Sequence, residues 1–262
     1  YQGPDQPHDF WTRALADFDN KEIRAWAARL NVGTLVQKSG RIYPKALKAA
    51  PLLRRWVEKL RKQGVDFRMS HRLVSLTGGK ASFEGPDGEV KIQATAIILA
   101  LGGGSWPQTG SDGRWVETLE KTGVKVNPLA PANCGWEVDW SSDLAEKLEA
   151  QPLKNVVASA GDKIAPGEIM LTRYGMEGGP LYALGPVLRT MKDPLLTLDF
   201  KPTFTIEKLV SKMESAKKNF LAESQYRWKL SDSMRLILEH FHGPFLSAEH
   251  LAQHAKACRI PL

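Results

Sequence analysis

Residues 96–115 read AIILALGGGSWPQTGSDGRW, an apolar run followed at once by three glycines and a second glycine-bearing turn. An apolar run without alternation is typical of a strand buried on both faces of a parallel sheet. The carboxyl ends of such strands form the crevice where α/β folds bind ligands, and glycine there lets backbone amides approach a ligand closely. The stretch predicts a ligand-binding strand end; the alternative is a glycine-rich loop that only turns the chain.

The composition is that of a globular domain with a basic surface. The 262 residues are 42% hydrophobic and 25% charged, and the formal net charge is +7. This charge favours anionic partners such as phosphates, nucleotides or RNA. Two cysteines indicate a reducing compartment, and neither a secretory signal nor an apolar run of membrane-spanning length is visible. We expect a cytoplasmic protein, with neither a membrane nor DNA as partner.

The first half of the chain alternates between predicted helices and strands. Helices are expected after Asp19 or Asn20 and over the segment that stops at Gly64, with Pro51 in or near its first turn. Alternation predicts a strand over 65–76, and the GPDG turn predicts a hairpin over 80–93. A Ser/Asp cap and Gly123 are expected to delimit a further helix within 111–123.

The second half has a different texture. Prolines separate short strands expected at 135–140, 155–160, 167–172 and 195–200, a pattern typical of a small barrel or sandwich. From Thr205 to Ala257 the pattern is helical, with candidate caps at Thr205, Ser231 and Ser247.

Four motifs together resemble one known family. ILALGGGSWPQTGSDG is similar to the ATGGxSxPxTGSxGxG signature of the BaiN/YhiN-like flavoproteins, and GRIYPKALKA (40–49) is similar to their GRVFPxxxKA stretch. PLAPANCGWEV (128–138) and GEIMLTRYGMEGGPLYAL (167–184) match two later motifs in the same order. Departures from the pattern are Leu101 for Thr, Trp106 for Tyr, Arg173 for His, and EGGP for SGP.

The resemblance implies an α/β FAD/NAD(P)-binding, Rossmann-like portion with an inserted small β-barrel and a helical subdomain. The expected boundaries are 1–126, 127–203 and 204–262. Family members hold the FAD pyrophosphate with a G-x-G-x-x-G element, which this sequence lacks. We therefore expect the chain to be the middle portion of such a flavoprotein, binding FAD weakly by itself.

The resemblance also assigns roles to individual residues. Leu73 is expected beside the adenine, Ala100 to Gly102 along the nucleotide, and the following turn beside the flavin ring. The expected cofactor-binding residues are Leu73, Ala100, Leu101, Gly102, Gly103, Gly104, Ser105, Trp106, Thr109, Gly110 and Ser111. Against this, the Ser105 hydroxyl could serve only its own turn, and Trp106 could be a core aromatic.

The loop at 172–180 supplies the candidate catalytic residues Arg173, Tyr174 and Glu177, which could orient a substrate or move a proton. The alternative is a surface loop with incidental polar residues. His250, His254 and Cys258 lie at i, i+4 and i+8, a spacing that metal ligands can have; half-buried or solvated histidines are the preferred interpretation, and no metal is expected.

Two classes of function follow. The first is an FAD-dependent oxidoreductase with NAD(P)H as electron donor, acting on a small metabolite or on a uridine in ribosomal RNA, as the resemblance implies. The second is a non-enzymatic module, truncated from a longer protein, that binds an anionic partner.

Overall fold

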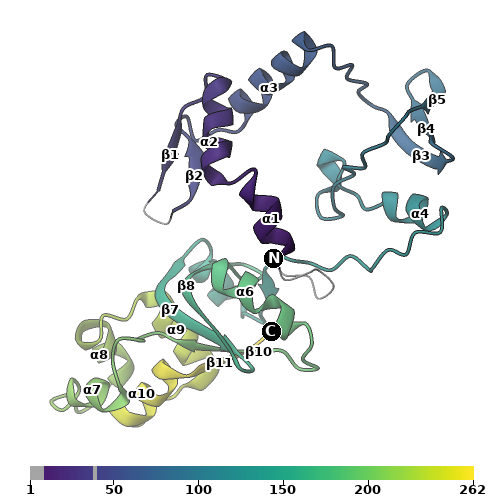
Figure 1. The fold of residues 1–262 in the computed structure, drawn as a ribbon. Coiled ribbons are helices and arrows are strands. Elements are labelled where there is room, and N and C mark those ends of the chain that lie inside the picture. The colour runs from purple at the N-terminus through teal and green to yellow at the C-terminus, as the bar shows by residue number, and fades with distance from the viewer. Residues whose placement is uncertain (1–8, 38–39) are drawn as a thin grey trace. The chain divides into compact units, whose positions relative to one another are not determined.

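The computed structural model describes residues 9–37 and 40–262 (Figure 1). Contacts along the chain divide it into two units. The first unit comprises the chain up to Leu101 together with Arg114–Val126. The second comprises Gly102–Gly113 and Asn127–Leu262. No helix in the described part is both long and apolar enough to cross a membrane.

The described residues of the first unit form four helices and two small antiparallel sheets. Its elements are α1 (Phe10–Ala16), α2 (Asn20–Arg29), β1 (Thr34–Val36), β2 (Ile42–Pro44), α3 (Ala50–Lys62), β3 (Arg72–Thr77), β4 (Lys80–Gly85), β5 (Gly88–Gln93) and α4 (Trp115–Glu120). β1 pairs with β2, and β3, β4 and β5 form a three-stranded sheet in that order.

Helix capping follows the sequence closely at α2 and α3. Asp19 Oδ1 accepts hydrogen bonds from the backbone N–H groups of Lys21 and Glu22, at 2.7 and 3.0 Å, which fixes the start of α2. α3 has Pro51 in its first turn and is followed by Gly64 with φ +88°, as predicted. The ring centroids of Trp26 on α2 and Trp56 on α3 lie 5.3 Å apart, edge to face.

Two predictions in this unit are corrected. The strand expected over 65–76 begins only at Arg72, and Val65 and Met69 are exposed rather than half-buried. α4 has no side-chain cap, because its N-cap position is Arg114 in helical conformation. The 80–93 hairpin, in contrast, is confirmed, with Gly85 paired to Gly88 across the turn.

The apolar run at 96–101 does not form a buried strand. Residues 96–101 have no regular secondary structure, and the Ile98 side chain is 93% exposed. Every strand pair in the described part of the chain is antiparallel. A strand buried on both faces needs hydrogen-bonded neighbours and covering layers, and none of the described residues supplies them here.

The second unit is built on a six-stranded antiparallel sheet. Its elements are η1 (Pro107–Thr109), β6 (Trp136–Glu137), α5 (Ser142–Leu148), β7 (Pro152–Ala160), β8 (Lys163–Thr172), β9 (Gly175–Glu177), α6 (Gly179–Leu188), β10 (Leu195–Asp199), α7 (Ile206–Ser211), α8 (Phe220–Arg227), α9 (Asp232–His242), α10 (Ala248–Lys256) and β11 (Cys258–Pro261). The strand order is β11-β10-β7-β8-β9-β6.

One hydrophobic cluster joins this sheet to its helices. Burial alternates along β7, β8, β10 and β11, so that one side chain in two enters the core. Leu184 of α6, Ile237 of α9 and Leu251 of α10 belong to the same cluster. Because helices and strands share this core, they stabilise one another.

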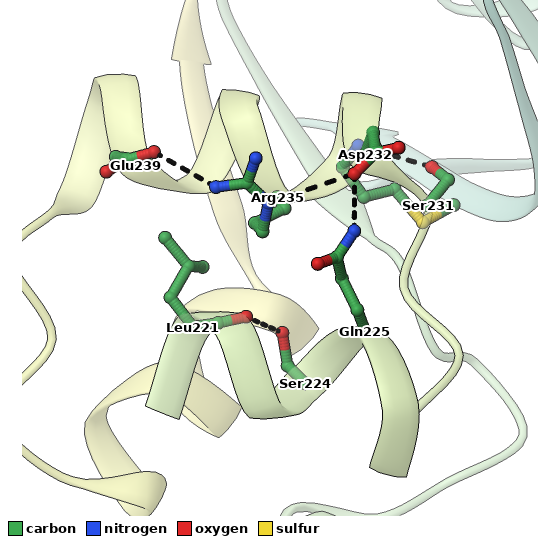
Figure 2. A network of polar contacts seen from close by, with 8 residues as sticks. Leu221, Ser224, Gln225, Ser231, Asp232, Arg235 and Glu239 are labelled. Carbon is green, nitrogen blue, oxygen red and sulfur yellow. Dashed lines mark hydrogen bonds and ion pairs between the residues drawn. The ribbon is translucent and has the colours of Figure 1, made fainter. Parts of the chain in front are cut away.

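The capping hydroxyls predicted for the helices are confirmed. Thr205, Ser231 and Ser247 each accept a hydrogen bond from a backbone N–H three residues on, at 3.3, 3.3 and 3.0 Å. Figure 2 shows that polar contacts also tie α8 to α9, where Gln225 donates to Asp232 and Arg235 lies between Asp232 and Glu239.

The strands expected at 155–160, 167–172 and 195–200 are confirmed, the one expected at 135–140 is only Trp136–Glu137, and the barrel is not confirmed. β6 and β11 stand at the two ends of the sheet order. β11 was not predicted; it adds the end of the sequence to β10, and Leu262 N–H continues the contact to Pro194 O at 3.0 Å. The division at 127–203 and 204–262 stays a prediction.

Gly175 provides a test of the sheet. Its φ is +154°, and a Cβ there would lie 1.9 Å from Trp136 O on the paired strand β6. Gly175→Ala is expected to lower the free energy of unfolding by about 3 kcal/mol or more, because the backbone of β6 would have to move away from the added methyl group. Gly179→Ala is the matched control, since no atom lies within 4 Å of its added methyl. Urea unfolding measures both; equal effects would contradict the close approach of β6 and β9.

Candidate functional site

The glycine-rich segment 102–113 is a compact turn held by its own hydrogen bonds. Trp106 and Ser111 exchange backbone hydrogen bonds at 3.1 and 3.2 Å, and the Gly113 N–H donates to Gly103 O at 3.1 Å. The Ser111 hydroxyl accepts from the Gly103 N–H at 3.0 Å. Positive φ at Gly102 and Gly110, +77° and +87°, shows why glycine stands at the two corners.

This turn leaves backbone donors free. Within the part of the chain that the structure describes, the N–H groups of Gly102, Gly104 and Ser105 have no hydrogen-bond acceptor. Gly102 and Gly104 are exposed, and no side chain of their own stands in front of the peptide. Such a turn fits a group rich in acceptor oxygens, as the phosphates and the ring carbonyls of FAD are.

The structure brings together only some of the predicted cofactor residues. Gly102 to Ser111 form the turn, with Trp106 62% exposed and therefore not a core aromatic. Leu73 lies in β3, paired with Phe83; before the turn, Ala100 is exposed and Leu101 is half-buried. These three residues belong to the other unit.

Tyr174 and Glu177 are adjacent in space. The Tyr174 hydroxyl donates to Glu177 Oε2 at 3.0 Å. The pKa of Tyr174 is raised, first by partial burial and then by the Glu177 carboxylate. Gly135 makes room for the ring, because a Cβ there would lie 3.0 Å from both Tyr174 Cε2 and Oη. The phenol of Tyr174 stays protonated and donates a hydrogen bond to the Glu177 carboxylate. A hydrogen-bonded pair of this kind is suited to proton transfer.

Arg173 has a different partner from Tyr174. Its backbone N–H donates to Glu149 Oε2 at 2.7 Å, and its Nε lies 3.7 Å from the same oxygen. Glu149 thereby orients the start of the loop, while the Arg173 side chain is 69% exposed. Sequence reasoning gave no role to Glu149, which lies in none of the motifs, or to Gly135, which lies in the motif at 128–138; folding brings both to this loop.

The histidines near the end of the chain form a ring cluster. His242 and His254 stack with centroids 4.2 Å apart, and His250 contacts His254 edge to face at 4.8 Å. Burial raises the pKa of the Cys258 thiol to about 12, so it stays protonated at neutral pH. No group of three or more His, Cys, Asp or Glu side chains among the described residues is arranged to hold a metal ion.

A family model gives the class of protein, a Rossmann-type domain. The HI0933-like protein Rossmann domain family matches residues 2–236, which is most of the chain. The chain therefore belongs to this family, as its motifs predicted.

One curated relative is similar over much of this chain. It is the "3-dehydro-bile acid delta(4,6)-reductase" of Clostridium scindens, 28% identical over 191 residues. The aligned part covers 70% of this chain and 45% of the relative. The chain thus spans about half the length of the curated relative that it matches.

The Tyr174–Glu177 contact predicts a titration. Glu177→Gln removes the negative charge and should lower the pKa of Tyr174 toward, but not fully to, the ordinary value of about 10, since burial remains. The measurement is the near-ultraviolet phenolate titration, with Tyr174→Phe used to isolate this residue from the other tyrosines.

Glu137→Gln is the control, because Glu137 on the neighbouring strand β6 makes no contact with the Tyr174 hydroxyl. An unchanged Tyr174 titration in Glu177→Gln would contradict the hydrogen bond.

Proposed function

We propose that this chain is the part of an FAD-dependent oxidoreductase that contacts the flavin, with NAD(P)H as electron donor. The observation that carries the proposal is the self-bonded turn 102–113, whose N–H groups at Gly102, Gly104 and Ser105 have no acceptor among the described residues. Membership of a Rossmann-type family and similarity to a reductase support it. When bound, FAD would supply hydride transfer.

The chain's own residues would then have distinct tasks. The backbone of Gly102 to Ser111 would hold the cofactor, extended by Leu73, Ala100 and Leu101 along the nucleotide. Tyr174 would turn its hydroxyl from Glu177 Oε2 toward the substrate, deliver the Oη proton there as the substrate gains negative charge, and regain a proton from water. Glu177 would hold the hydroxyl in place, and the exposed guanidinium of Arg173 would orient an anionic substrate.

Two substrate classes have separate support. The name of the relative supports a small apolar molecule with a carboxylate. The net charge of +7 supports RNA instead. Affinity for ribosomal RNA that falls steeply with salt would favour RNA, whereas reoxidation of the reduced flavin by a 3-dehydro-bile acid would favour the small molecule.

The proposal is tested by the colour of the full-length protein. We expect purified material to show flavin absorbance and to bleach when NADH or NADPH is added without oxygen. Tyr174→Phe should slow reoxidation by substrate about 100-fold at unchanged flavin content. Protein that stays colourless after incubation with FAD would contradict the proposal and favour the non-enzymatic module.

A second prediction concerns the turn itself. Alanine at Gly102, with φ +77°, is strained by about 1–2 kcal/mol, so Gly102→Ala should weaken FAD binding roughly tenfold. Gly123→Ala carries the same strain, at φ +85°, but lies after α4 and should leave FAD affinity unchanged. Flavin fluorescence titration compares them; equal affinities would argue against the turn as the flavin contact.

A further inference from the structure

A cleft of about 910 Å³ lies in the second unit, between the β7–β8 strands and the segments that follow β10 and α8. Its volume is within the range of small-molecule sites. The polar lining includes Lys154, Asn155, Lys201, Thr203, Lys229 and Ser231. None of these was singled out by the family motifs.

The charge of the lining is uncompensated. Three lysines face one carboxylate, that of Glu168, among the described residues that line the cleft. None of the three ammonium groups forms an ion pair with any residue that the structure describes. A concave surface of one sign concentrates counter-ions, because its low-dielectric walls focus the field.

Lys201 is the central residue. It is half-buried, which lowers the pKa of its ammonium. Its Nζ donates to Lys229 O at 2.7 Å, a bond that uses one of three N–H donors. The nearby Asp199 carboxylate does not neutralise it, because Asp199 Oδ1 accepts from the Lys201 backbone N–H and Oδ2 pairs with Lys256 at 2.5 Å.

The rest of the lining is apolar. Val156, Phe204 and Met234 line the cleft together with three prolines. An anion with an apolar or planar body would find both charge and apolar contact here, whereas an extended polyanion such as RNA would need a longer basic surface. Lysine binds phosphate as a point charge, and the described lining offers three lysines for it.

We propose that this cleft binds a small phosphate-bearing molecule, with the phosphate held by Lys201 and flanked by Lys154 and Lys229. The site is separate in its residues from the turn 102–113. It goes beyond the proposed function and does not depend on it.

The test uses the full-length protein with one equivalent of FAD, so that a flavin site is filled and no free FAD competes for the cleft when inorganic pyrophosphate is titrated calorimetrically. We expect saturable binding that weakens as salt rises. Lys201→Gln should weaken it about tenfold, through loss of one charge-assisted hydrogen bond. Lys154→Gln/Lys229→Gln should do likewise without touching the Lys201 side chain. Lys163→Gln, on β8 outside the cleft, is the matched control.

Lysine acylation read by mass spectrometry locates the site. Pyrophosphate should protect Lys154, Lys201 and Lys229 several-fold and leave Lys163 unprotected. Three results would each overturn the proposal: absence of binding, equal weakening by Lys163→Gln, and malonate binding as tightly as pyrophosphate. Failure of FAD to bind would leave these outcomes unchanged, and so would count only against the proposed function.

Discussion

Burial of apolar side chains between the six-stranded sheet and its helices is the constraint on which the second unit depends. Leu153, Ile169 and Leu198 reach full burial because strands flank them in the sheet and helices cover them. All six residues at 96–101 are apolar, yet the Ile98 side chain is 93% exposed. The same physics explains both: apolar residues form a buried strand only where neighbouring strands and layers are present.

The site geometry follows from this sheet. Trp136 on β6 pairs with Met176 on β9, which requires a residue without a side chain at Gly175. The approach of the two strands brings Gly135 against the Tyr174 ring and leaves the hydroxyl beside Glu177. Paired backbone thus positions Tyr174, which lies between β8 and β9, and Glu177, which ends β9.

Local patterns predicted local features well. The caps at Asp19, Thr205, Ser231 and Ser247, and the hairpin at 80–93, are set by contacts within a few residues. The features that failed depend on distant partners: burial at 96–101 needs other strands, and β11 forms only because β10, 60 residues earlier, offers an edge.

The candidate site divides in the same way. The turn 102–113 was predictable because it is stabilised by hydrogen bonds between its own residues, such as that from the Gly103 N–H to the Ser111 hydroxyl. The partner of Arg173 was not, because Glu149 reaches it through folding across 24 residues. The lysines of the 910 Å³ cleft come from three separate segments with no shared motif.

The central claim is that bare backbone at this turn contacts a flavin. Hydrogen–deuterium exchange of the full-length protein, with and without FAD, tests it most directly. The account predicts slower exchange of the amides of Gly102, Gly104 and Ser105 when FAD is added. Unchanged exchange there, with protection confined to other segments, would contradict it.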